Sequence, residues 1–297
     1  MLATQDSTDN PRVLTWGRGV NGQLGHNSQP SHEVAAPTAV PHLEGRPVTR
    51  LACGQFHTAA VVAGAKGSGK VLTWGRGTLG VLGHGDEEDK LVPQAVEPLA
   101  KVDVRSVACG AYQTAAVTRA GELFCWGWQF EDGPAGSIQE GYTCVPQRME
   151  SLGALAVRHV SCGNYAAVAL TTDGGAYTWG KGARGVLGHG HSRDVATPTR
   201  VGALAGTFVW DARLGKSFLL CLSAAGELFS NGAADGGVLG HNSRSGEDTP
   251  RRVTALGGTR VVAISCGDSH AAALTGSGDA YCWGCGLPAP TALPVTV

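Results

Sequence analysis

The chain has 297 residues, of which 42% are apolar and 16% are charged, and its formal net charge is −1. That apolar share is enough for a folded core, while the lack of a lysine- and arginine-rich run argues against binding to a nucleic-acid backbone or an anionic membrane surface. Because no apolar run approaches the roughly 20 residues of a membrane helix and the first residues do not form a signal peptide, we expect a soluble protein of the cytoplasm or nucleus, without nucleic-acid partners or membrane insertion.

One motif recurs along the chain and organises it. In its full form it reads W-G-x-G-x-x-G-x-L-G-H, the third copy is degraded and the sixth is a stub. The copies start at Trp16, Trp74, Trp126, Trp179, Asn231 and Trp283, in steps of 58, 52, 53, 52 and 52 residues. Self-similarity at a fixed period of this size is typical of propellers, solenoids and arrays.

Each period contains four short segments that are rich in β-branched or aromatic residues and are bounded by turn formers. In the first copy these are Val13–Trp16, Pro37–Val40, Val48–Cys53 and Thr58–Val62. A turn with a glycine at a fixed place, such as TRAGEL at 118–123, joins the fourth segment to the next copy and predicts an antiparallel hairpin. Since no window shows a helical period, we predict an all-β chain of four-stranded antiparallel propeller blades.

Alanine, serine and cysteine crowd the third and fourth segments of each period. Small side chains are expected where inner strands converge on a narrow axis. Cys53, Cys109, Cys162 and Cys266 share one position in four copies. Equivalent positions lie about one repeat width apart, which exceeds the ~4.4–6.8 Å between Cα atoms that a disulfide allows. We therefore expect small buried thiols in a reducing compartment.

The pairing of W-G-x-G and L-G-H-G with C-G-x-x-H-T-A-A-V resembles the regulator of chromosome condensation repeat, from Val13 to the C-terminus. The resemblance implies a β-propeller, usually with seven blades. Its members include nucleotide-exchange factors for small GTPases, domains of ubiquitin ligases, and a plant ultraviolet-B photoreceptor. That photoreceptor depends on a repeated Gly-Trp-Arg-His-Thr. The corresponding stretches here start at Gly54, Gly110, Gly163, Gly215 and Gly267 and contain no tryptophan, so we do not expect light sensing.

The number of repeats departs from the family pattern. Five complete repeats start near Val13, Val71, Leu123, Ala176 and Leu228, and a half repeat starts at Ala280. APTALP at 289–294 matches the second segment of the other copies. Both ends therefore offer the same pair of strands, which predicts an incomplete or irregularly closed ring. We expect an N-terminal tail over 1–12 and one propeller domain over 13–297.

Residues that break the repeat are candidates for partner binding. After Trp126 the third copy lacks L-G-H-G and contains Trp128, Phe130, Glu131 and Asp132. This aromatic and acidic composition, in what we expect to be a loop, is favoured at protein interfaces. The alternative is a drifted repeat whose aromatic residues fill the gap.

The fourth copy replaces the small-Cys-Gly pattern with Arg213-Leu-Gly-Lys216. Arg213 stands where other copies have alanine or serine, so it either extends to the rim or meets a carboxylate. We include Arg213 and Lys216 among the candidate partner-binding residues, with structural drift as the alternative.

Other motifs do not indicate chemistry. His26, His84, His189 and His241 occur once per blade, too far apart for one metal ion with bonds of ~2 Å, and are predicted to bond locally in turns. Residues 64–71 nearly match a phosphate loop but join two hairpin strands and lack its final hydroxyl. The lone C-x-x-C at 282–285 is a weak metal or redox signal. We expect no cofactor, no metal and no enzymatic activity.

Two functional hypotheses follow. The first is a non-enzymatic protein-binding scaffold, because the repeated residues have structural roles and the irregular ones occur in loops. The alternative is a guanine-nucleotide exchange factor for a small GTPase, which rests on analogy of fold. A third, that the chain is part of a larger ubiquitin ligase or kinase, stays open.

Overall fold

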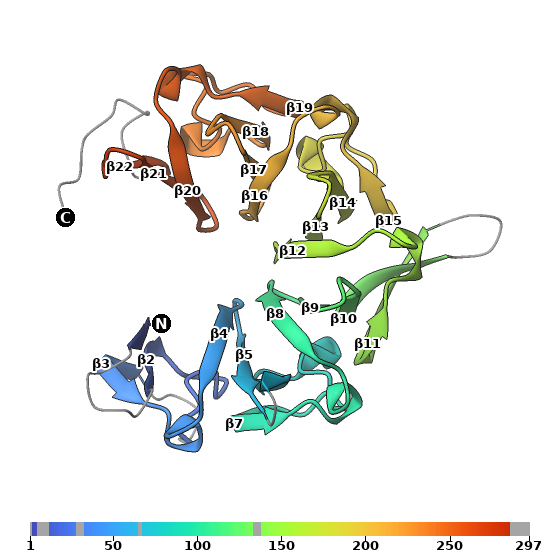
Figure 1. Ribbon diagram of the computed structural model, residues 1–297, viewed down its shortest axis with the longest axis vertical. Coiled ribbons are helices and arrows are strands. Elements are labelled where there is room, and N and C mark those ends of the chain that lie inside the picture. Colours follow the sequence, from blue (N-terminus) through green and yellow to red (C-terminus); the bar gives the residue numbers. More distant parts are fainter. Residues whose placement is uncertain (1, 5–11, 28–32, 65–66, 133–137, 286–297) are drawn as a thin grey trace. The chain divides into compact units, whose positions relative to one another are not determined.

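The computed structural model describes residues 2–4, 12–27, 33–64, 67–132 and 138–285. They form 22 strands in six antiparallel sheets and contain no α-helix (Figure 1), which confirms the predicted all-β, β-propeller class. Within these residues four sheets have four strands, and the first and last have three. The search for a helix long and apolar enough to cross a membrane finds none among them.

The chain divides into two compact units, and the first comprises Met1–Gln129 and Glu140–Glu150. Its three sheets have the strand orders β1-β2-β3, β4-β5-β6-β7 and β11-β10-β9-β8. The strands are β1 (Leu2–Thr4), β2 (Arg12–Arg18), β3 (Glu33–Ala39), β4 (Val48–Cys53), β5 (His57–Ala63), β6 (Gly69–Gly75), β7 (Lys90–Ala95), β8 (Val104–Cys109), β9 (Gln113–Thr118), β10 (Leu123–Asp132) and β11 (Ile138–Arg148), of which residues 130–139 group with the second unit.

The second unit otherwise runs from Ser151 to Val297 and also has three sheets. Their strands, in order of pairing, are β12 (Val157–Cys162), β13 (Ala166–Thr171), β14 (Ala176–Gly180), β15 (Val195–Arg200); β16 (Val209–Leu214), β17 (Phe218–Ser223), β18 (Leu228–Gly232), β19 (Glu247–Arg252); and β20 (Val261–Cys266), β21 (His270–Thr275), β22 (Ala280–Gly284). Short 3-10 helices connect strands in both units: η1 (Pro41–Leu43), η3 (Thr78–Gly80), η4 (Glu97–Leu99), η6 (Glu150–Leu152), η7 (Ala183–Gly185), η8 (Gly202–Leu204), η9 (Asp235–Gly237) and η10 (Thr254–Leu256).

The sheets are offset by half a period from the sequence repeats. The predicted hairpins are confirmed, because β5 pairs with β6, β9 with β10, β13 with β14, β17 with β18 and β21 with β22. Their turns use the fixed glycine at positive φ, as at Gly226 (φ +85°) and Gly278 (φ +93°). Each four-stranded sheet therefore takes two strands from one repeat and two from the next.

The N-terminal segment expected to be a tail contains a strand. β1 pairs antiparallel with β2, with Leu2 opposite Leu14, in the place that a strand of the preceding repeat takes in the other sheets. The expected strand at 289–294 lies outside the described residues. The single-domain boundaries and the incomplete ring stay predictions.

The third strand of each repeat, which ends in Cys-Gly in four copies and in Leu-Gly in β16, is here called the inner strand and lies at one edge of its sheet. In the first unit β4 contacts β8, and in the second β16 contacts both β12 and β20 (Figure 1). The expectation of buried thiols is correct only for Cys162, since Cys53 is exposed and Cys109 and Cys266 are half-buried. An edge strand has a neighbour on one side only, which leaves its end less covered. Burial raises the pKa of the Cys162 thiol to about 12.

Neighbouring sheets are linked by a hydrogen bond from the motif's first residue. An indole N–H donates to a backbone carbonyl in the L-G-H loop of the preceding sheet. These bonds join Trp74 to Gln23 (2.9 Å), Trp126 to Val81 (2.8 Å) and Trp283 to Val238 (2.7 Å). Asn231 replaces tryptophan in its copy and donates from Nδ2 to the Val186 carbonyl at 2.9 Å. The replacement therefore keeps the donor.

The L-G-H histidines are turn residues, as predicted, and each bonds a hydroxyl on the neighbouring strand. The pairs are Thr15–His26 (2.8 Å), Thr73–His84 (3.0 Å), Thr178–His189 (3.0 Å) and Ser230–His241 (2.9 Å). The Thr73 hydroxyl donates to the Leu82 carbonyl at 2.6 Å, so Nε2 of His84 must carry the proton that Thr73 accepts. Burial lowers the pKa of His84, which favours this neutral ring.

His57 makes a second link between sheets of the first unit. It is 1% exposed, and its Nε2 lies 2.7 Å from Oγ1 of Thr114, which itself donates to the Val81 carbonyl at 2.7 Å. Nε2 therefore donates, and Nδ1 has no hydrogen-bond partner within the described part of the chain. Burial lowers the pKa of His57 to about 4.

Removing the Thr73 hydroxyl should destabilise the protein. Thr73→Val removes the donor to the Leu82 carbonyl and the hydroxyl that His84 Nε2 contacts, so we expect the free energy of unfolding to fall by about 2 kcal/mol. Thr73→Ser, which copies Ser230, should cost less than about 1 kcal/mol because it removes only a methyl group. Urea denaturation measures both, and equal losses would contradict the assigned role of the hydroxyl.

Protonation of His57 should destabilise the fold in acid. Its pKa is lower in the folded chain than the ordinary value of 6.5, so the unfolded state binds the proton more tightly. The free energy of unfolding is therefore highest above pH 6.5, and it decreases by about 3 kcal/mol as the pH falls towards 4. His57→Gln, which copies Gln113 of the next sheet, should show a smaller loss than wild type when melting temperature is followed between pH 7 and pH 4.

Candidate functional site

The predicted residues of the third copy are not in a loop. Trp128 and Phe130 lie in β10, which continues to Asp132, so the predicted loop is wrong. Trp128 is 6% exposed and its indole donates to Glu140 Oε2 at 3.3 Å, as expected if the aromatic residues of a drifted repeat fill the gap. Glu131 and Asp132 belong to the same strand, of which only the backbone is described there. Partner binding by these four residues stays a prediction.

Arg213 of the fourth copy meets a carboxylate, which was one of its two predicted alternatives. On β16 its Nη2 lies 3.2 Å from Oδ2 of Asp211, two residues earlier. Lys216 is exposed in the turn between β16 and β17, and its backbone N–H donates to the Asp268 carbonyl at 3.0 Å. Arg213 is thus paired with Asp211 on the inner strand β16, whereas Lys216 is exposed in the turn that follows.

Asp211 also faces His159, which sequence reasoning did not select. Nε2 of His159 on β12 lies 3.2 Å from Oδ1 of Asp211, without the alignment of a hydrogen bond. Burial, assisted by the positive charge of Arg213, lowers the pKa of His159 to about 4 although Asp211 opposes the shift. At neutral pH the imidazole is therefore uncharged, and the cluster holds one carboxylate and one guanidinium.

A repeated β-bulge lies at the second residue of the inner strands. In the second unit the strand register shifts between Val157 and His159, between Val209 and Asp211, and between Val261 and Ala263. The extra residues are Arg158, Trp210 and Val262. A bulged residue is left out of the ladder and its side chain is re-aimed. As a result Trp210 is 56% exposed and Val262 is 42% exposed.

Arg158 and two aromatic rings form one cluster at these bulges. The guanidinium carbon lies 5.3 Å from the ring centroid of Trp210 and 5.6 Å from that of Phe208, and Arg158 Nη2 donates to the Val209 carbonyl. Phe208 is 41% exposed. Contacts of a guanidinium with ring faces contribute roughly 0.5–2 kcal/mol each and hold the rings in place. We call Arg158, Phe208 and Trp210 the bulge surface.

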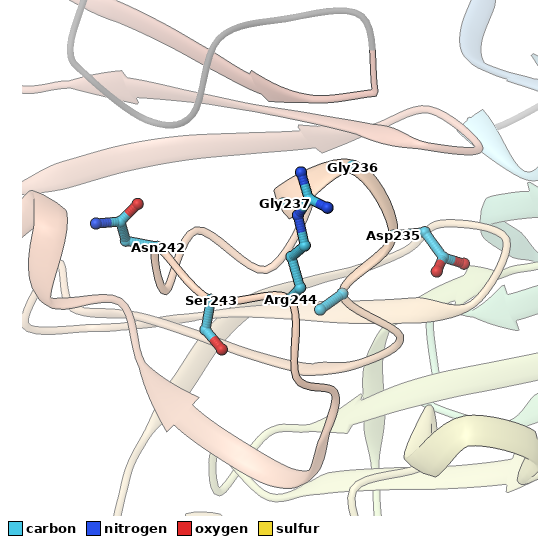
Figure 2. A pocket seen from close by; sticks show the side chains of 7 residues that line it. Asp235, Gly236, Gly237, Asn242, Ser243 and Arg244 are labelled. Atoms are coloured by element: carbon cyan, nitrogen blue, oxygen red, sulfur yellow. The ribbon is translucent and has the colours of Figure 1, made fainter.

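The pockets contain no arrangement of side chains that indicates catalysis. A pocket of about 590 Å³ at η9 is lined by backbone and by Asp235, Asn242, Ser243 and Arg244 (Figure 2). The Asp235 carboxylate is held by a paired contact with Arg184, with Nη2 to Oδ1 at 2.6 Å. The lining therefore brings no acid and base together for catalysis.

A second pocket, of about 680 Å³, lies beside the hairpin that resembles a phosphate loop. Lys70 lines this pocket, and its Nζ donates to the Ala100 carbonyl. The backbone N–H of Gly69 donates to Asp103 at 2.8 Å. Both groups therefore form hydrogen bonds within the fold. The segment joins the antiparallel strands β5 and β6, as the sequence indicated. The described residues contain no group of three potential metal ligands.

The signal for the bulge surface was present in the sequence. The inner strands read VRHVSC at 157–162, VWDARL at 209–214 and VVAISC at 261–266. This alignment places Trp210 at a position where the other copies have arginine, threonine or valine. This departure from the repeat lies inside a strand and not in a loop, where binding residues are commonly found.

Comparison of the chain with known proteins identifies its family. The model of the RCC1-like domain matches residues 4–290. The chain belongs to the RCC1-like domain family. It is 37% identical over 263 residues to the human E3 ubiquitin-protein ligase HERC2, and 34% identical over 274 residues to the ultraviolet-B receptor UVR8 of Arabidopsis thaliana. These matches cover 87% and 92% of the chain, but only 5% of HERC2 and 61% of UVR8.

Solved structures of other proteins share the fold. The crystal structure of human WBSCR16 matches with a TM-score of 0.80 and 26% identity over 95% of this chain and 77% of that one. Prp20p from Saccharomyces cerevisiae, described with its binding properties to Gsp1p and histones, matches with a TM-score of 0.75 over 96% of this chain and 68% of its own. At 22% identity the second match shows the fold alone.

Proposed function

We propose that this RCC1-like propeller is a protein-binding scaffold whose partner docks on the bulge surface. The observation that carries the proposal is Trp210, which is 56% exposed and whose ring lies against the Arg158 guanidinium, which also lies over the ring of Phe208. Single exposed apolar residues are ordinary, whereas a patch built from residues of two neighbouring sheets is typical of interaction sites. Tryptophan and arginine supply most of the binding energy at protein interfaces.

Preorganisation also supports this surface. Arg158 is held by two rings and by the Val209 carbonyl, so a partner would find its side chain already ordered. Trp210 is the extra residue of a bulge in β16. Its backbone is fixed because the residues on both sides of the bulge are paired with β17. Binding to an ordered surface loses less side-chain entropy than binding to mobile chains.

A second candidate function is nucleotide exchange on a small GTPase. It rests on the likeness in fold to Prp20p, whose structure was described with binding to Gsp1p. Its candidate residues are Glu131 and Asp132 at the end of β10 and Arg213 on β16. Release of a labelled nucleotide from a panel of small GTPases separates the two functions, because a scaffold leaves the release rate unchanged.

The scaffold is tested with Trp210→Ser. Partners are captured with the tagged chain, identified by quantitative mass spectrometry, and the main one is purified and titrated. Truncation of a hot-spot residue weakens the free energy of binding by at least about 2 kcal/mol, so the dissociation constant should rise about 30-fold. Tyr142→Ser is the matched control, because Tyr142 is an aromatic residue 45% exposed on β11 of the first unit. Equal binding by both variants would show that the partner uses another surface.

A further inference from the structure

The hairpin of β5 and β6 is longer than its counterparts in the other sheets. The step from the inner-strand cysteine to the next tryptophan is 21 residues here and 17 in three other copies. The four extra residues form two further pairs of the ladder, Val62 with Lys70 and Ala63 with Gly69, so that this hairpin has seven pairs where the others have five. We call these the added pairs. They extend the regular strands of this sheet.

The added pairs are fixed on both sides. The backbone N–H of Ala63 donates to the Pro47 carbonyl, just before β4, at 2.8 Å. The backbone N–H of Gly69 donates to the Asp103 carboxylate, just before β8 of the next sheet, also at 2.8 Å. A Cβ at Gly69 would lie 1.7 Å from the Val104 carbonyl oxygen, so the hairpin packs directly on that sheet. A segment held in this way loses little entropy when a ligand binds beside it.

A pocket of about 680 Å³ lies beside this hairpin, within the first unit. The added pairs contribute Val62, Ala63 and Lys70 to its lining, and further lining comes from β7 and η4. Val96 and Leu99 are at most 2% exposed and make its interior apolar. Pockets of roughly 300–1,000 Å³ with an apolar lining and a few polar groups bind small organic molecules.

The charged side chains in the described lining favour an anion. Lys70 and Arg46 are positive and Glu97 is negative. Nζ of Lys70 donates to the carbonyl of Ala100, which also lines the pocket, so the ammonium is fixed there. An ammonium has three N–H groups, and two remain for a ligand. A carboxylate accepts such donors in strong charge-assisted hydrogen bonds.

We propose that this pocket binds a small amphipathic carboxylate. Its apolar chain or ring packs against Val96 and Leu99, and its carboxylate accepts hydrogen bonds from Lys70. The added pairs supply both one side of the pocket and the cation, which the shorter hairpins of the other sheets do not have. The inference is independent of the bulge surface, which belongs to the second unit.

The recognition of the carboxylate is tested by isothermal titration calorimetry with decanoate, and with 1-decanol as the uncharged molecule of the same chain length. The wild-type chain should bind one decanoate, and Lys70→Gln should weaken that binding about tenfold or more while leaving the affinity for 1-decanol unchanged. Lys101→Gln is the matched control, because Lys101 is an exposed lysine outside the lining and its loss should change neither affinity. Equal weakening by the two variants would overturn the assigned role of Lys70.

The position of the site is tested by filling the pocket. Ala95 on β7 lines the pocket and is exposed, so the indole of Ala95→Trp should occupy the space and abolish binding of both molecules. Gln94→Trp is the matched control, because Gln94 is exposed on the opposite face of the same strand and its variant should bind like wild type. Circular dichroism verifies that each variant is folded. Decanoate binding that Ala95→Trp leaves intact would overturn the proposal, as would the absence of saturable binding to the wild-type chain at about 1 mM decanoate.

Discussion

The fold depends on one repeated hydrogen bond, in which four of the described sheets donate an N–H to the L-G-H loop of the sheet before them. The donor is an indole in three copies and the amide of Asn231 in another, so the chemistry of the bond is kept while the size of the side chain changes. The loop that accepts the bond is itself fixed by a hydroxyl and a histidine. This chain of contacts explains why glycine, threonine and histidine recur together and why none of them is available for chemistry.

The repetition of these bonds made the architecture predictable. The period, the hairpin glycines and the alternation of short strands predict the pairing of β5 with β6 and of β17 with β18, because each depends on residues close in sequence. Trp128 was placed in a loop because the L-G-H motif is missing after it. The strand continues because aromatic residues extend β10, which the motif could not show. The pairing of β1 with β2, between residues eight to twelve positions apart, was missed because the segment before Val13 lies outside the regular repeat.

The site was predictable only in part, because its contacts join neighbouring repeats. Arg213 was selected for its charge at a position of small residues, but its partner Asp211 and the nearby His159 belong to two strands whose contact the sequence does not specify. The exposure of Trp210 follows from a bulge, in which two residues of one strand face one of its partner. Bulges depend on register and have no signature in composition, so a tryptophan in a strand reads as core.

The half-period offset between sheets and sequence repeats has an evolutionary consequence. Gain or loss of one whole period at a repeat boundary joins the first two strands of one sheet to the last two of another, so the resulting sheet again has four strands. Unequal recombination between repeats can therefore change the number of blades in this lineage without creating a defective sheet. A gene fragment cut at the beginning of a tryptophan motif, by contrast, separates strands that are hydrogen-bonded to each other.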